Sequence, residues 1–93
     1  MKNDFDPGAL FVTRGIQHAD IPVEPLYLRH CLGDWGDLSA DDKELNDEAA
    51  ACNLREGRIL SVYLVGEQKI YLITEHDPEV GENRTIVMLA EEY

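Results

Sequence analysis

The sequence has few basic residues for its many acidic ones. Lysine and arginine together number 8 against 19 aspartates and glutamates, which gives the 93 residues a formal net charge of −11. A charge of this sign and size repels DNA, RNA and anionic lipid, so we expect no direct contact with nucleic acid or with a membrane. The same charge attracts a basic surface on another protein. The composition therefore favours a protein partner.

Cysteines and long apolar runs are also scarce. Cys31 and Cys52 match neither a disulfide framework nor a zinc module, so we expect two reduced thiols in the core of a cytoplasmic protein. No apolar run approaches the roughly 18 residues that a membrane span needs. The first ten residues contain no apolar signal-peptide core. The sequence thus predicts a protein that is neither secreted nor inserted in a membrane.

Motifs of the common enzyme classes are missing. The chain has no phosphate-binding glycine loop, no nucleophile elbow and no HExxH zinc motif. Glu75, His76 and Asp77 form the densest group of proton-transfer side chains, but on a strand His76 points away from the two carboxylates. His30 and Cys31 are neighbours on a predicted helix and point apart. We therefore expect no enzymatic activity and no cofactor.

The rest of the sequence predicts one folded domain preceded by an arm. Hydrophobic residues make up 44% of the chain and charged residues 29%, which are ordinary proportions for a folded domain. Pro7 and Gly8 separate residues 1–8, which we predict to be a flexible N-terminal arm, from residues 9–93. We predict that residues 9–93 form a single α+β domain.

The predicted order of elements is β-α-α-β-β-β. Strands are predicted where β-branched and aromatic residues gather, over residues 9–16, 58–65, 69–75 and 84–91. Polar connections join the last three strands, so we expect an antiparallel sheet. The 58–65 strand should be central, because both of its faces are largely apolar. We expect the two helices to pack on one face of the sheet.

The first helix is predicted in the sequence LYLRHCL, residues 26–32. Leu28, Cys31 and Leu32 recur there at the spacing of one apolar helical face. Gly33 follows directly, and a glycine in this place is typical of a helix C-terminus.

The second helix follows the segment GDWGD and carries most of the acids in the middle of the chain. Ser39 is a favourable N-cap, and Leu45, Ala49 and Cys52 recur at the spacing of a buried face. The carboxylates then point outward or lie on the flanks of the helix. Seven acids and the tryptophan make up the predicted partner-binding surface: Asp34, Trp35, Asp37, Asp41, Asp42, Glu44, Asp47 and Glu48.

The tryptophan motif allows three interpretations. Its two glycines can supply the backbone angles of a turn between helices, while Trp35 fills the edge of the core. Trp35 can instead be partly exposed in a binding surface, where tryptophan is favoured. Asp34 and Asp37 could also approach a divalent ion, but the residues after Asp37 break the spacing of a calcium loop. We therefore expect no metal site.

Arg14 stands out because the chain has few basic residues. It lies in the segment VTRGI, directly before Gly15. We expect its guanidinium to form an ion pair with a carboxylate of the second helix or with the C-terminal Glu91 and Glu92.

Several of these segments occur in an order that resembles a known family. The order is FVTRGI, GDWGDLSADDKELND, GRILSVY, KIYLITEHD and TIVMLAEEY. Across residues 11–93 the chain resembles small plasmid- and phage-related proteins of unknown activity, which share the T-R-G, G-D-W-G-D, I-T-E-x-D and terminal E-Y motifs. The loop at residues 78–83 is longer than the connection usual in that family. The resemblance implies a mobile-element context, in which small acidic proteins often act against host defence.

Charge and resemblance together predict a non-enzymatic binding protein of a mobile genetic element. We expect its acidic surface to dock on a basic, nucleic-acid-handling host protein and to obstruct it, as an anti-CRISPR or anti-restriction factor does. The alternative is a regulatory or structural interaction module that forms a homodimer through an exposed edge of its sheet. A small metal-dependent enzyme is a third hypothesis, for which no motif argues.

Overall fold

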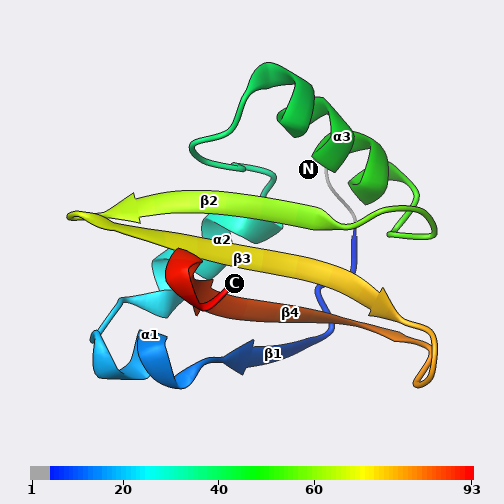
Figure 1. The fold of residues 1–93 in the computed structure, drawn as a ribbon. Coiled ribbons are helices and arrows are strands. Elements are labelled where there is room, and N and C mark those ends of the chain that lie inside the picture. Colours follow the sequence, from blue (N-terminus) through cyan, green and yellow to red (C-terminus); the bar gives the residue numbers. More distant parts are fainter. Residues whose placement is uncertain (1–4) are drawn as a thin grey trace.

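The computed structural model describes residues 5–93 as a four-stranded sheet flanked by helices (Figure 1). The strands lie in the order β1 (Ala9–Val12), β4 (Glu82–Leu89), β3 (Gln68–Asp77) and β2 (Ile59–Val65). Strands β2, β3 and β4 form an antiparallel meander, and β1 pairs with β4 in parallel. The predicted α+β class is therefore confirmed. The sheet is mostly antiparallel, as predicted for β2, β3 and β4, and the parallel pairing of β1 departs from the predicted antiparallel sheet.

Residues 5–93 contain one more α-helix than the sequence predicted. The helices are α1 (Arg14–His18), α2 (Val23–Cys31) and α3 (Ala40–Ala51), with the 3₁₀ helix η1 (Ala90–Glu92) after β4. The strand predicted over residues 9–16 ends early, because the Thr13 side chain accepts the Ile16 N–H and caps α1. No helix within residues 5–93 has both the length and the apolar character needed to cross a bilayer.

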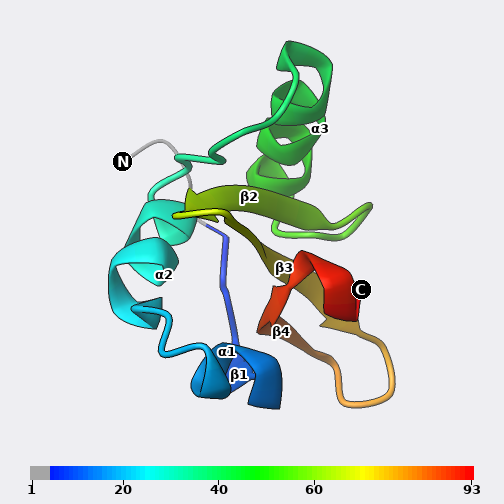
Figure 2. The same ribbon diagram turned by 60° about the vertical axis from the view of Figure 1, so that its left-hand side comes forward.

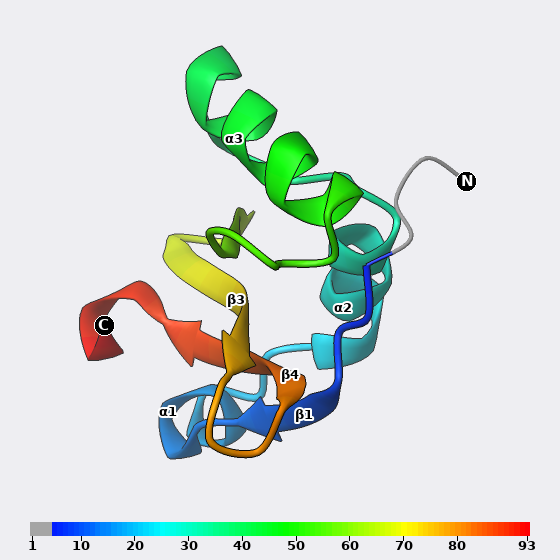
Figure 3. The same cartoon turned by 90° about the vertical axis from the view of Figure 1, so that its right-hand side faces the viewer.

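The helices do not share one face of the sheet. In Figures 2 and 3, α2 covers one face, whereas α3 lies beyond the edge formed by β2. The main core lies between the sheet and the first two helices, with these buried residues: Ile16, Leu26, Tyr63, Ile70, Leu72, Val87 and Leu89. A second cluster lies beneath α3, with these buried residues: Phe5, Trp35, Ala49, Ala50, Leu54 and Ile59.

The buried side of α2 differs from the predicted apolar stripe. Leu26 and His30, four residues apart, are the buried positions. Leu28 and Leu32 are each 55% exposed, and Cys31 is only half-buried. The prediction failed because a polar residue occupies the buried side, where both ring nitrogens of His30 find hydrogen-bond partners.

Strand β2 lies at an edge of the sheet, although its apolar faces predicted a central position. No strand pairs with the outer edge of β2 within residues 5–93; the Asn46 side chain and the backbone of the turn around Trp35 cover it instead. The Asn46 side chain of α3 donates to the Leu60 carbonyl at 2.7 Å and accepts the Leu60 N–H at 3.1 Å. Farther along, the Val62 N–H donates to the Trp35 carbonyl, and the Asp37 N–H donates to the Val62 carbonyl. These contacts protect the edge against pairing with another chain.

Part of the predicted N-terminal arm is docked on the domain. Residues 1–4 lie outside the described residues, so the prediction stands untested there. Phe5 is buried, and its ring packs against Trp35 with 6.2 Å between the ring centroids. The Asp6 carbonyl accepts a 2.7 Å hydrogen bond from an asparagine side chain of β4. Residues 5–8 are therefore held by the domain, because apolar packing and backbone hydrogen bonds fix them.

Candidate functional site

The GDWGD segment is a turn that fixes α3 to the sheet. Gly33 and Gly36 have φ angles of +86° and +82°, and a Cβ on Gly36 would lie 2.0 Å from the Val62 carbonyl oxygen. Trp35 is 3% exposed, and its indole N–H donates to Asp47 of α3 at 2.9 Å. The interpretation of Trp35 as a filler of the core edge is confirmed. Trp35 is therefore withdrawn from the partner-binding surface, because no partner can reach its side chain.

All seven predicted carboxylates are exposed, but two of them have partners inside the protein. Asp34 forms a 2.7 Å ion pair with Arg29, and the hydrogen bond lowers the pKa of Asp34 and raises that of Arg29. Asp47 accepts the indole N–H of Trp35. These two side chains stabilise the turn and the attachment of α3, so the other five acids are the stronger candidates for binding.

The acidic ridge, which we define as Asp41, Glu44 and Glu48, projects from one side of α3. The three positions recur at i, i+3 and i+7, so their side chains lie along one line of the helix. All three are exposed, and within residues 5–93 none of them takes part in an ion pair. Asn46 and Ala50 lie on the other side of α3 and are buried. The ridge therefore presents free negative charge on a firmly attached helix.

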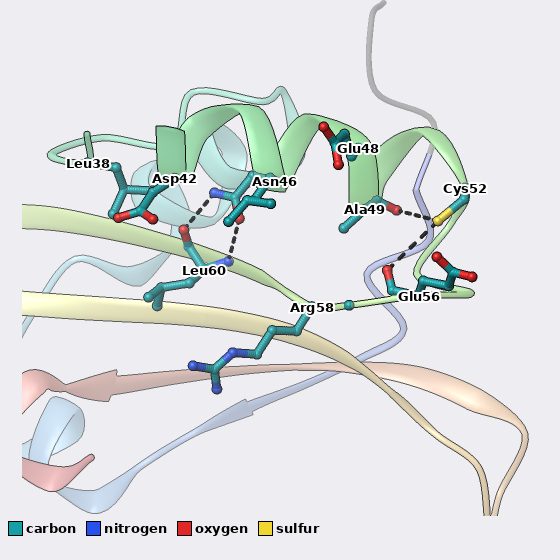
Figure 4. Close-up of a pocket in the computed structure, with 11 residues that line it drawn as sticks. Leu38, Asp42, Asn46, Glu48, Ala49, Cys52, Glu56, Arg58 and Leu60 are labelled. Atoms are coloured by element: carbon teal, nitrogen blue, oxygen red, sulfur yellow. Dashed lines mark hydrogen bonds between the residues drawn. The ribbon is translucent and has the colours of Figure 1, made fainter. Parts of the chain in front are cut away.

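A groove runs beside the acidic ridge, between α3 and the start of β2 (Figure 4). Its volume is about 490 Å³. Its floor is mostly apolar and is lined by Leu38, Leu45, Ala49, Cys52 and Leu60. Its polar lining consists of Asp42, Asn46, Glu48, Glu56 and Arg58, with Gly57 between the last two. Apolar surface and carboxylates thus meet in one place.

Leu45 is the groove residue that the helical spacing misplaced. The spacing predicted Leu45 in the core, but its side chain is 61% exposed, whereas the neighbouring Asn46 is buried. Asn46 takes the position against β2 because its amide satisfies both backbone groups of Leu60. Of the other predicted core positions on this helix, Ala49 is buried and Cys52 is half-buried.

A signal in the sequence could have identified Leu45 as an exposed residue. It follows Asp41 and Asp42 by four and three residues and precedes Glu48 by three. On a helix these four side chains are neighbours, and a leucine among three carboxylates is not in the ordinary setting of a core residue.

The groove also contains a thiol. Backbone N–H groups after α3, that of Glu56 first, lower the pKa of Cys52, whereas burial raises the pKa of Cys31. Both cysteines are free thiols and only half-buried. The prediction that both lie in the core was therefore wrong. Within residues 5–93 no group of three or more His, Cys, Asp or Glu side chains could hold a metal ion.

The T-R-G and E-Y segments meet at the Glu92 carboxylate. It accepts the Thr13 hydroxyl at 2.7 Å, the Gly15 N–H at 3.2 Å and the Leu89 N–H at 2.8 Å. These hydrogen bonds, that of Thr13 first, lower the pKa of Glu92. Arg14 is exposed and forms no ion pair with any residue that the structure describes. The predicted ion pair of Arg14 was therefore wrong. The two neighbours of Arg14, Thr13 and Gly15, bind the Glu92 carboxylate instead.

A chain of buried hydrogen bonds crosses the core at His30. The Thr85 hydroxyl donates to the Pro7 carbonyl, so it accepts from Thr74, whose oxygen in turn accepts from Nε2 of His30. Nδ1 of His30 then accepts the Ser61 hydroxyl at 2.6 Å. This assignment requires a neutral imidazole, which burial favours because it lowers the pKa of His30 to about 4. This chain connects α2, β2, β3, β4 and the N-terminal segment.

The group Glu75-His76-Asp77 does not converge, as the strand alternation predicted. Glu75 and Asp77 both contact Arg84, at 3.1 and 3.6 Å. His76 hydrogen-bonds Asn83 instead, at 2.9 Å. The three side chains serve the pairing of β3 with β4.

The acidic ridge and the groove form the candidate site of this protein. Exposed apolar side chains beside free carboxylates suit a partner surface that is cationic and partly apolar. Comparisons with family models, with curated proteins and with solved structures found no match to this chain.

Proposed function

We propose that the chain is a non-enzymatic, cytoplasmic binding protein of a mobile genetic element. It docks α3 on a basic, nucleic-acid-handling host protein and obstructs it, in the manner of an anti-CRISPR or anti-restriction factor. The observation that carries this proposal is the acidic ridge of exposed, unpaired carboxylates. In a basic groove such carboxylates take the places of nucleic-acid phosphates.

The attachment of α3 supports this role. Trp35 contacts Asp47, and Asn46 contacts Leu60, so the helix is fixed to the sheet on its inner side. A helix already held in its binding geometry loses little conformational freedom when a partner binds. The carboxylates of Asp41 and Asp42 also lie in the first turn, where the helix dipole stabilises negative charge.

The charge of α3 supports fast and salt-sensitive association. The helix ADDKELNDEAAA carries five carboxylates and one ammonium group. Such a local excess of one sign steers an oppositely charged partner toward the helix, and added salt screens the attraction. The proposed binding residues are Asp37, Asp41, Asp42, Glu44, Leu45 and Glu48.

The test is capture of the host partner by two variants of equal charge. In the ridge variant the three carboxylates of the acidic ridge and the neighbouring Asp42 are neutralised, by Asp41→Asn, Glu44→Gln, Glu48→Gln and Asp42→Asn. In the control, four exposed carboxylates elsewhere are neutralised by Glu67→Gln, Glu79→Gln, Glu82→Gln and Glu91→Gln. Circular dichroism checks that both variants fold.

We expect the wild type and the control to retain a nucleic-acid-binding protein that the ridge variant loses by about tenfold or more. A short DNA duplex should release that protein from the wild type, because both ligands occupy the same basic surface. Capture that is equal for the ridge variant, or that does not fall between low and high salt, would contradict the proposed function.

A second candidate function is that of a homodimeric interaction module. The observation that favours it is β1, an edge strand whose Leu10 and Phe11 are exposed. The other edge of the sheet is covered by Asn46 and the Trp35 turn. Within residues 5–93, β1 is therefore the less covered edge, where the Gln17 side chain donates only to the Val12 carbonyl.

A further inference from the structure

We infer that the groove between α3 and β2 receives a cationic amphipathic helix of the partner. An apolar side chain of that helix enters the groove, and its lysines or arginines meet the carboxylates of the rim. This inference rests on the proposed function and adds the chemistry of the segment that is bound.

The apolar floor needs a cover that the described chain does not supply. Leu45 is 61% exposed, and it lies beside Leu38, Cys52 and Leu60, which are each half-buried. The core beneath α3 is closed by Ala49 and other residues, so Leu45 contributes little to it. An exposed leucine next to a concave apolar surface is the kind of place where a partner's side chain gains most from leaving water.

The rim of the groove is negatively charged, because three carboxylates line it and the guanidinium of Arg58, its basic lining residue, points away from α3. Asp42, Glu48 and Glu56 line the groove. Arg58 extends away from α3, and its guanidinium lies 5.5 Å from the centroid of the Tyr93 ring (Figure 4). The charge that an incoming segment meets is therefore negative, and lysine or arginine beside its apolar anchor complements it.

Charge and backbone hydrogen bonding favour a helix in the groove over a second copy of this chain or an added β-strand. A second copy of this chain would bring a further charge of −11 and be repelled. An added β-strand finds no free partner along this part of β2, because Asn46 and the Trp35 turn hold the backbone groups of Leu60 and Val62. A helix needs no backbone pairing and docks through its side chains.

The test uses two labelled peptides of about 15 residues that contain the same leucines and lysines. In the first peptide the leucines recur at i, i+3 and i+4 along one helical face, and in the second they are spread around the helix. Fluorescence anisotropy measures the affinity of each for the wild type, for Leu45→Gln and for Leu64→Thr. Leu64 is a matched control, because it is similarly exposed but does not line the groove.

We expect the wild type to bind the amphipathic peptide about tenfold more tightly than its isomer. Leu45→Gln should remove most of this preference, Leu64→Thr should preserve it, and both peptides should lose affinity for the ridge variant. The amphipathic peptide should also slow the alkylation of Cys52, which lines the groove, and leave that of Cys31 unchanged.

Equal affinity for the two peptides, an unchanged preference in Leu45→Gln, or unprotected Cys52 would overturn the inference. If any of these occurs while the ridge variant still fails to capture the host partner, only the groove inference falls. If the ridge variant captures the partner normally, the proposed function itself falls.

Discussion

His30 shows how a single buried residue can set the pH range in which the protein is stable. Its ring lies among Phe5, Trp35, Ser61 and Thr74, and within residues 5–93 its hydrogen-bond partners and ring contacts include no carboxylate or ammonium group. Burial lowers its pKa from the ordinary 6.5 to about 4. Protonation therefore favours the unfolded chain. The stability due to a neutral His30 is complete above pH 6.5 and is lost as the pH falls toward 4.

We predict that the free energy of unfolding falls by about 2 kcal/mol between pH 7 and pH 5. Urea unfolding at a series of pH values measures it. The carboxylates with lowered pKa, Asp34 and Glu92, lose their contribution only at lower pH, below about 4.5. A flat profile between pH 7 and pH 5 would show that His30 does not control stability. A folded His30→Gln variant should lack this pH dependence.

Hydrogen bonds made by single residues also explain most of the motifs that were visible in the sequence. Trp35, Ser61, Thr74 and Glu92 lie in the segments on which the family resemblance rests, but the hydrogen-bond partner of each belongs to another element, 12 to 79 residues away. A single sequence shows such residues without showing what they contact. The structure assigns these four to hydrogen bonds that join elements.

At the scale of elements, helix positions were more predictable than helix faces. Ser39 was identified as the N-cap of α3, and its side chain accepts the Asp42 N–H. In both longer helices, leucines predicted to lie in the core are exposed, for the same reason. His30 and Asn46 hold buried positions because the sheet satisfies their polar atoms, and this partnership exists only after the strands assemble. Apolar spacing alone therefore assigned exposed leucines to the core.

We predict that Asn46→Ala lowers the free energy of unfolding by about 1–3 kcal/mol, because it leaves the N–H and carbonyl of Leu60 without partners. Urea unfolding gives the magnitude. Amide hydrogen exchange should show faster exchange at Leu60 than in the wild type. Glu44→Ala on the exposed side of α3 is the control and should change stability by less than about 0.5 kcal/mol. If Asn46→Ala also changed the free energy of unfolding by less than about 0.5 kcal/mol, water would be replacing the hydrogen bonds of the amide at no cost in stability.

For the whole molecule, charge and edge protection both oppose self-association. The net charge of −11 repels a second copy, and one edge of the sheet is covered. Within residues 5–93 the other edge is β1, where Phe11 is 54% exposed and the Gln17 side chain donates to the Val12 carbonyl. The net charge can be read from the sequence, but which edge of the sheet stays uncovered depends on the parallel pairing of β1 with β4, which local sequence patterns do not reveal.

We therefore predict a monomer of 10.5 kDa in physiological salt at concentrations of tens of micromolar, measured by light scattering after size exclusion. A dimer would favour the interaction-module hypothesis. Phe11→Lys then decides whether β1 is responsible, because a charge on that strand should return the protein to a monomer. A dimer unaffected by this substitution would exclude the β1 edge as its interface.

The parallel pairing of β1 with β4 has a consequence for synthesis on the ribosome. Of the strands within residues 5–93, β1 is made before the others, yet the strand it pairs with begins only at Glu82, and the Thr13 hydroxyl contacts Glu92, 79 residues away. Leu10 and Phe11 therefore emerge long before their partner strand exists. The hairpin of β2 and β3 can form earlier from local contacts, but β1 is paired only after β4 has left the exit tunnel. A chain truncated before β4 lacks the strand on which its N-terminal strand folds.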